Sequence, residues 1–255
     1  MHLPLDYVVS LLQSAFIEGR DISENVLYHL GLADFLHDSG YPAWLLITDL
    51  AGAYDSVDRS YLLECLAANG FRVDGHVRWA DLLHAGTTGC ITMNGHISRP
   101  FPISAGLAQG APGSTVYWTV VCEPLIQRIN SLAAQGRISL PPVPGCAHPP
   151  GALAFADDIK ALVTDPAADG ALLVDACDEF EKASGVPLSV PKSVAVPLSV
   201  PARLLQPPVQ ADLPTTVPGL GFTIPPRRYA AEAAGNPIHG RLCTGQAEGV
   251  RPASR

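Results

Sequence analysis

The chain has 255 residues, enough for one large hydrophobic core or two small ones. A hydrophobic content of 47% suits a globular fold, whereas a formal net charge of −8 argues against a free-standing nucleic-acid binder with a basic face. The N-terminal stretch MHLPLDYVVSLLQ lacks the basic start of a secretory signal, and no apolar run reaches the ~18 residues of a membrane span. We therefore expect an intracellular protein with no signal peptide and no transmembrane segment.

The first third of the chain is predicted to hold one strand between helices. Apolar residues recur at helical spacing over residues 22–37, with Ser23 as the expected N-cap. Residues 43–50, AWLLITDL, are a short apolar run typical of a buried strand, and Asp49 lies near its end. Two further helices are expected, one capped by Asp58 and one over residues 75–84.

The middle of the chain combines a hairpin, a loop and a long helix. Asn94-Gly95 between two β-prone runs predicts a hairpin. The glycine-rich loop GLAQGAPGS (106–114) follows, and a long helix is expected to open at Pro112 and to end at Gly136.

The remaining segments complete an α+β pattern. Residues 152–163 predict strand, turn and strand, residues 169–184 predict an amphipathic helix, and residues 193–198 predict one more strand. Residues 201–255 are proline-rich without sustained periodicity, so we expect a disordered tail. The order of elements indicates helices packed on a largely antiparallel sheet.

The stretch LAFADDIKAL (153–162) would be an ordinary buried strand without its two adjacent carboxylates. Burying an unpaired carboxylate costs several kcal/mol or forces it to take up a proton. A tight turn would lift Asp157 and Asp158 into a cleft, where Mg²⁺, which prefers carboxylate oxygens, would keep them ionised. Asp49 is the candidate for completing a two-ion site for phosphoryl transfer. The alternative is a solvated Asp-Asp turn without chemistry, with Asp49 capping a strand end.

Five stretches, in register along the chain, resemble the palm of reverse transcriptases from non-LTR (LINE-like) retrotransposons. QSAFIEGRDISENVL is similar to the segment that precedes the palm in that family. Motif A is similar to LLITDLAGAYDSVDRSYLLECLAANGF, and motif B to GLAQGAPGSTVYWTVVCEPLIQRI. Motif C is similar to FADD, and motif D to SGVPLSVPKSVAV. The resemblance implies an α+β palm, an antiparallel sheet with helices on one face, over residues 43–200. A partial fingers segment at 1–42 would precede it, and the tail at 201–255 would follow.

The same resemblance implies roles for individual residues. Asp49 and Asp157 would bind two Mg²⁺ ions, with Mn²⁺ as a substitute, and Asp158 would be the second motif C carboxylate and a further metal ligand. Lys192 would be the motif D lysine, a general acid for the leaving pyrophosphate; the alternative is an ordinary surface lysine.

Nucleotide and nucleic-acid contacts are implied in the same way. Tyr54 would be the aromatic gate that rejects a ribose 2′-OH, with a plain core aromatic as the alternative. Gln109 and Gly110 would lie against the incoming nucleotide and template. Arg20 would contact nucleic-acid backbone, with an internal salt bridge as the alternative, and Asp55 is expected to be structural.

Departures from the family pattern leave the activity open. Gly52, Ala108 and Ser189 stand where the family commonly has Lys, Arg and Asn. The upstream fingers strand and the helical thumb are not recognised, so we expect a truncated copy whose missing parts the full-length element supplies. The implied partners are RNA template, DNA primer and dNTP, with action in the nucleus. The alternatives are an inert palm remnant and a general Mg²⁺ phosphohydrolase.

Overall fold

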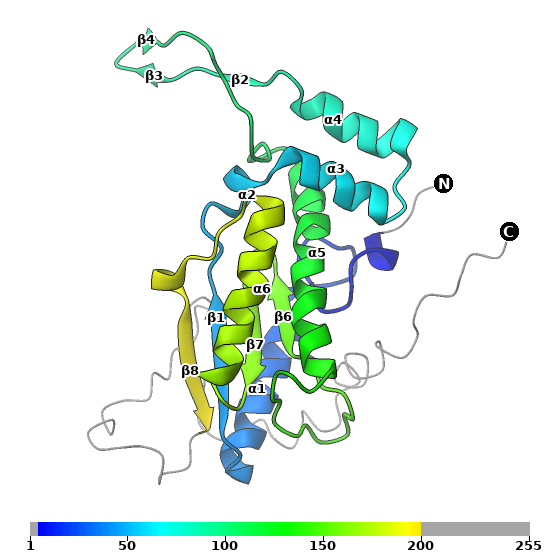
Figure 1. Cartoon of the computed structure of the whole chain (residues 1–255), viewed down its shortest axis with the longest axis vertical. Coiled ribbons are helices and arrows are strands. Elements are labelled where there is room, and N and C mark those ends of the chain that lie inside the picture. Colours follow the sequence, from blue (N-terminus) through cyan, green and yellow to red (C-terminus); the bar gives the residue numbers. More distant parts are fainter. Residues whose placement is uncertain (1–4, 200–255) are drawn as a thin grey trace, which may run out of the picture.

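The computed structural model of the chain describes residues 5–199, and the expected tail lies outside them. A four-stranded antiparallel sheet forms the centre, in the order β6-β7-β1-β8 (Figure 1). Its strands are β6 (Ala152–Phe155), β7 (Asp158–Val163), β1 (Ala43–Thr48) and β8 (Val194–Ser199). The two central strands therefore come from the AWLLITDL run and from the second half of the aspartate hairpin, which confirms the α+β fold.

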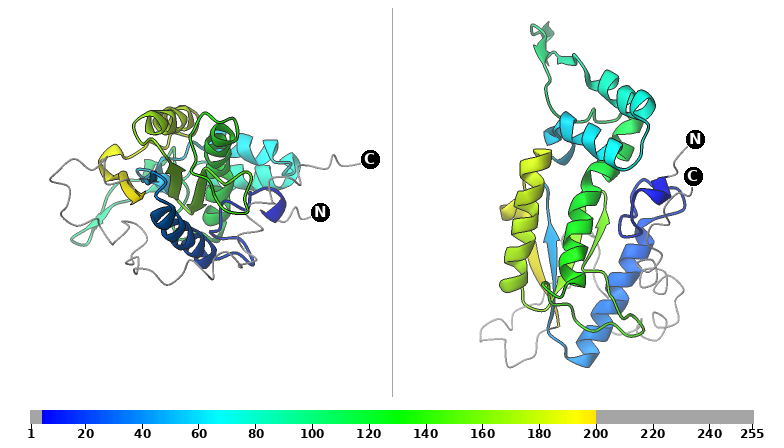
Figure 2. Two further views of the ribbon diagram at one scale, coloured as in Figure 1. Left: turned by 90° about the horizontal axis from the view of Figure 1, so that it is seen from below. Right: turned by 45° about the vertical axis from the view of Figure 1, so that its right-hand side comes forward.

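Helices cover both faces of this sheet. Two of them, α5 (Pro112–Ala134) and α6 (Ala168–Ser184), pack on each other and on one face, as expected for a palm. The helix α1 (Ile22–Ser39), which belongs to the segment assigned to the fingers, lies across the opposite face against β6 and β8 (Figure 2).

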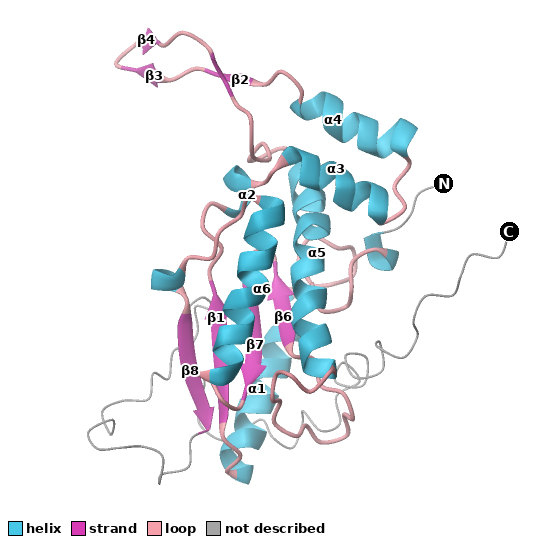
Figure 3. Ribbon diagram, viewed as in Figure 1, coloured by secondary structure: helices cyan, strands magenta, loops and turns pink. Residues whose placement is uncertain are grey.

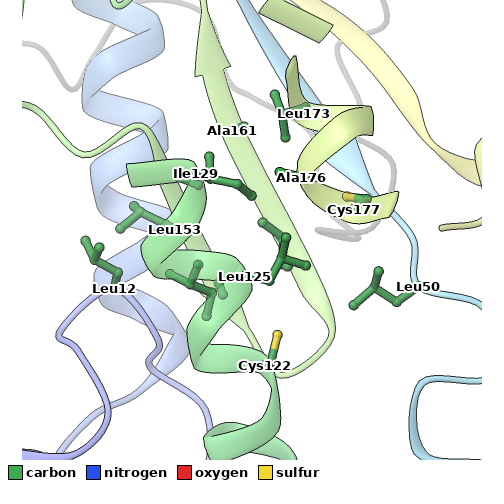
Figure 4. Packing of buried hydrophobic residues seen from close by; sticks show 14 of the residues in the cluster. Leu12, Leu50, Cys122, Leu125, Ile129, Leu153, Ala161, Leu173, Ala176 and Cys177 are labelled. Atoms are coloured by element: carbon green, nitrogen blue, oxygen red, sulfur yellow. The ribbon is translucent and has the colours of Figure 1, made fainter. Parts of the chain in front are cut away.

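One hydrophobic core joins α5, α6 and the sheet. Leu125 and Ile129 on α5 point towards α6 and β7, where they meet Leu173 and Ala161 (Figure 4). Trp118, also on α5, has no exposed surface. Burying each large apolar side chain stabilises the fold by about 1.5–3 kcal/mol, so this face rigidly supports the strands that carry the aspartates.

The helix α1 begins and packs differently from the expectation. Its N-cap is Asp21, whose carboxylate accepts a hydrogen bond from the Ser23 N–H, so the assignment of Ser23 as the cap was wrong. Asn25 and His29 are buried on the same helix. Polar residues on the buried face make the amphipathic pattern of a helix weaker in the sequence. The Asp58 cap is confirmed, since its side chain accepts from the Ser60 and Tyr61 amides.

An arm projects from the helices beyond the sheet (Figure 3). Asn94-Gly95 joins two paired strands, which confirms the predicted hairpin, and a second short pair continues it. The arm strands are β2 (Thr88–Gly89), β3 (Thr92–Met93), β4 (His96–Ile97) and β5 (Phe101–Pro102). The remaining helical elements are η1 (Leu5–Tyr7), α2 (Ala53–Ser56), α3 (Arg59–Ala68), the π turn η2 (Val73–Val77), α4 (Arg78–His84) and η3 (Val190–Lys192). Among residues 5–199, no helix has both the length and the apolar character to cross a membrane.

Gly106 is the point at which the glycine-rich loop meets the turn after β1. Its φ is +85°, and a Cβ built there would lie 2.6 Å from the Asp55 carbonyl oxygen. The Gly106 N–H donates to the Val57 carbonyl, and the next amide, Leu107, donates to the Tyr54 carbonyl. The glycine-rich loop can therefore pack this closely against the turn after β1 only because residue 106 has no side chain.

We expect Gly106→Ala to lower the free energy of unfolding by more than its φ alone explains. A left-handed alanine costs about 1–2 kcal/mol, and the contact with Asp55 adds about 1–3 kcal/mol of overpacking. Gly136→Ala is the matched control, because Gly136 has a φ of +69° with nothing within 4 Å. Urea denaturation of both variants measures the difference, and equal losses would show that the close approach is absent.

Candidate active site

Strand pairing places Asp49 beside Asp158. The antiparallel register of β1 and β7 ends with Thr48 opposite Ile159, so the next pair in the same register is Asp49 and Asp158. Paired residues share one face of a sheet and lie about 4.5–5.5 Å apart at Cα. Residues 109 positions apart in the chain are thus brought to the same end of the two central strands.

Asp157 lies in the adjoining hairpin turn. Phe155 pairs with Asp158, which leaves a two-residue loop of Ala156 and Asp157. The predicted turn is confirmed, but Asp158 is the first residue of β7 and not part of the loop. Ala156 has a φ of 58°, and a positive φ at the first loop position is a feature of type II′ hairpin turns. The turn keeps Ala156 buried and leaves both aspartates partly exposed.

The three carboxylates act on one another electrostatically. The pKa of Asp158 is raised, first by burial and further by the negative charges of Asp157 and Asp49, while Lys160 opposes the shift. Like charges that raise a carboxyl pKa must lie close to it. This mutual repulsion is what a bound cation would relieve.

Two cations flank the carboxylates, and they are two of the chain's three lysines. Lys160, 3% exposed, lies 3.8 Å from an Asp158 oxygen, and burial lowers its pKa. Lys192, 71% exposed, places its Nζ 3.6 Å from Asp49 Oδ2. Lys192 therefore approaches the carboxylates from the solvent side, whereas the Lys160 side chain is buried inside the protein.

The backbone of Asp49 is held by the segment around η3. The Asp49 N–H donates to Ser193 Oγ at 3.2 Å, and the Asp49 carbonyl accepts from the Ser189 N–H at 2.8 Å. Ser193 Oγ in turn donates to the Ser189 carbonyl, which closes the loop on itself. The strand end is thereby fixed from both sides.

The residues fit a cation, although they are not assembled around one. Within residues 5–199, no group of three or more His, Cys, Asp or Glu side chains has the arrangement of a metal site. Asp49 Oδ2, however, is buried and accepts no hydrogen bond. A buried carboxylate oxygen without a donor is costly, and oxygen ligands of this kind suit Mg²⁺ or Mn²⁺.

Tyr54 lies near the carboxylates, whereas Gln109 contacts Asp55. The Tyr54 ring stacks on Trp118 with centroids 5.3 Å apart, and burial followed by the charge of Asp157 raises the pKa of Tyr54 to about 12. Gln109 is exposed and donates to Asp55 Oδ1 at 2.9 Å, and Gly110 beside it is also exposed. Asp55 thus has the structural contact that was expected of it.

Arg20 lies away from solvent and serves the fold. Its side chain is 7% exposed and pairs with Asp6 at 3.2 Å, and it also donates to the Val9, Ser10 and Gln13 carbonyls. The internal salt bridge, which was the alternative, is what the structure contains. We therefore do not assign Arg20 to nucleic-acid binding.

Three residues near the aspartates were missed. Lys160 shares a strand face with Asp158 at i+2, so strand periodicity alone could have identified it. Ser193 and Gln13 act through hydrogen bonds to the backbone of distant segments, and no local pattern signals such contacts.

Comparison with known proteins identifies a matching family. Residues 3–224 match the family described as "Reverse transcriptase (RNA-dependent DNA polymerase)". The Xenopus laevis "Transposon TX1 uncharacterized 149 kDa protein" is 28% identical over 114 residues, which cover 45% of this chain and 9% of that protein.

A solved telomerase structure shares the fold. Apo telomerase from Candida tropicalis aligns with a TM-score of 0.50 and 12% identity over 69% of this chain and 32% of that chain. Telomerase from Candida albicans, in complex with a TWJ fragment of telomeric RNA, aligns with a TM-score of 0.48 and 10% identity over 68% and 30%. This chain thus spans less than a third of that Candida tropicalis telomerase chain and under a tenth of the transposon protein. Because the family match covers most of the sequence, the chain belongs to the reverse transcriptase family.

Proposed function

We propose that this chain is the palm of an RNA-directed DNA polymerase that joins nucleotides by a two-metal mechanism. The observation that carries the proposal is the register of β1 and β7, which ends with Thr48 opposite Ile159 and so brings Asp49 to the end of the sheet where Asp158 and the Asp157 turn lie. Asp49 Oδ2 is buried and accepts no hydrogen bond, and the Lys192 ammonium lies 3.6 Å from it, which supports a cation at this position.

Asp49, Asp157 and Asp158 would hold the two Mg²⁺ ions, or Mn²⁺ in their place. When bound, the ions would activate the primer 3′-OH and stabilise charge on the phosphate. The primer oxygen attacks the α-phosphate of a dNTP, and pyrophosphate leaves. Lys192 is exposed and lies 3.6 Å from Asp49 Oδ2, and it would move towards that leaving group and give it a proton.

Tyr54, Gln109 and Gly110 would receive the nucleotide. Tyr54 is held by its stack on Trp118 and by the Leu107 amide, so its ring has little freedom to yield to a 2′-OH. The exposed Gln109 and Gly110 face solvent at the loop that follows. We infer that RNA template and DNA primer bind here together with the dNTP.

The net charge of −8 implies that other protein segments supply much of the affinity for nucleic acid. Phosphate contacts depend on Lys and Arg, and Gly52 and Ala108 offer no cation where the family commonly has one. We infer that fingers and thumb elements of a longer polypeptide complete the polymerase. The lack of a cation at positions 52 and 108 also favours the alternative, a palm that folds but has no polymerase activity.

Primer extension on an RNA template with Mg²⁺ and dNTPs tests the proposal. We expect extension by the native chain and a loss of at least ~100-fold in Asp157→Asn and Asp158→Asn, since metal charge stabilisation is worth several kcal/mol. Asp175→Asn, at an exposed position on α6, is the matched control and should extend normally. No extension by a folded native chain would favour the inert palm, and nucleotide hydrolysis without template would favour a phosphohydrolase.

We expect Lys192→Met to lower the rate of nucleotide addition by ~10²–10⁴-fold without a change in melting temperature, because an exposed lysine packs against little and general acids contribute rates of this size. Lys182→Met removes an exposed lysine of equal charge from the end of α6 and is the control. Single-turnover kinetics separate this step from nucleotide binding. Equal rates in the two variants would remove Lys192 from the mechanism.

We expect Tyr54→Val to raise ribonucleotide incorporation relative to deoxyribonucleotide ~10–200-fold, the range for small steric differences in a pocket. Tyr54→Phe keeps the ring and its stack on Trp118, so its selectivity should stay native. Competition between dNTP and rNTP in gel-based extension gives the ratio. An unchanged ratio in Tyr54→Val would show that the ring is only part of the core.

A further inference from the structure

The buried amide of Gln13 bonds both backbone polar groups of the turn residue Ala156. Gln13 Nε2 donates to the Ala156 carbonyl at 3.0 Å, and Gln13 Oε1 accepts from the Ala156 N–H at 3.0 Å. The same oxygen accepts from the Ala15 N–H, and the side chain is fully buried. Gln13 is thus directed at the residue that precedes Asp157.

Ala156 needs this support for two reasons. Its φ of 58° is unfavourable for a residue with a Cβ. It is also buried, so its N–H and carbonyl need hydrogen-bond partners inside the protein. The two bonds from Gln13 orient the peptide planes on either side of Ala156, and the second plane contains the nitrogen of Asp157. Gln13 therefore holds the backbone from which the Asp157 side chain projects.

The loop that carries Gln13 is anchored independently of this contact. The Arg20 guanidinium donates to the Gln13 carbonyl at 2.8 Å and to the Val9 carbonyl at 3.1 Å. The buried Glu123 on α5 accepts from the Ser10 N–H at 3.1 Å. These hydrogen bonds, including those from Arg20, fix the loop against α5. A mobile loop could not hold the Ala156 turn in one position.

We propose that Gln13 is a positioning residue for the metal site, holding the Ala156-Asp157 turn so that the Asp157 carboxylate faces Asp49 and Asp158. This inference rests on the proposed function, since it concerns the same three carboxylates. Gln13 touches neither substrate nor metal in this role and acts only through the backbone of Ala156.

Asn130 provides a matched control for a purely structural role. It lies on α5, is 6% exposed, and bonds the start of β6, the strand that leads into the Ala156 turn. Its Nδ2 donates to the Ala152 carbonyl at 3.1 Å, and its Oδ1 accepts from the Ala152 N–H at 3.2 Å. Each amide makes the same pair of backbone bonds to one residue: Gln13 to Ala156 in the turn after β6, and Asn130 to Ala152, the first residue of β6.

The test compares the native chain, Gln13→Met and Asn130→Leu, which remove the amides at similar side-chain volume. Mn²⁺ binding is followed by electron paramagnetic resonance of the free ion, and backbone amide exchange by nuclear magnetic resonance. We expect Gln13→Met to weaken Mn²⁺ binding at least ~10-fold, as loss of a group that orients a ligand does. It should also speed exchange of the Ala156 amide. Asn130→Leu should speed exchange of the Ala152 amide and leave Mn²⁺ affinity native.

Native Mn²⁺ affinity in Gln13→Met, or an equal loss in Asn130→Leu, would overturn the positioning role. Gln13→Asn keeps an amide but shortens the side chain by one methylene, and we expect it to fold and to behave like Gln13→Met. If both Gln13 variants unfold while Asn130→Leu stays folded, the amide serves the whole fold and the proposal is rejected. Failure of the proposed function differs, because the native chain itself would then bind no Mn²⁺ and extend no primer.

Discussion

The pairing of β1 with β7 is the constraint on which the rest of the site depends. A shift of one residue in this antiparallel register would turn every side chain of the strand to the other face. The register is fixed by the core: Leu45 and Leu162, a pair within it, are both buried. Packing that stabilises the sheet thus also decides that Asp49 and Asp158 meet at its end.

Each aspartate segment is then held through its backbone by a different part of the chain. Ser189 and Ser193 bond the main chain of Asp49, and Gln13 bonds that of Ala156. The carboxylates themselves carry few hydrogen bonds, which leaves their oxygens available. A rigid backbone that holds carboxylates in place is what a metal site requires, and the pKa of Asp158 is raised first by burial and then by the charges of Asp157 and Asp49.

Local sequence patterns predicted much of this fold, because turns, helix caps and hairpins are each specified by a few neighbouring residues. The aspartate turn, the Asp58 cap and the Asn94-Gly95 hairpin each depend on neighbours in sequence, and each was expected. Contacts between distant segments were not: Gln13 and Ala156 are 143 residues apart, and nothing near either one indicates the other. For Arg20 the sequence left a nucleic-acid contact and an internal salt bridge open, and only the folded loop shows that its donors are used internally.

The most direct test of this account is anomalous diffraction from crystals of the protein soaked in Mn²⁺ and a dNTP. Two-metal catalysis predicts a pair of manganese peaks about 3.5–4 Å apart, bound by oxygens of Asp49 and Asp157 with Asp158 adjacent. Manganese found only elsewhere, or Asp49 separated from the hairpin turn by more than a ligand bridge can span, would contradict it.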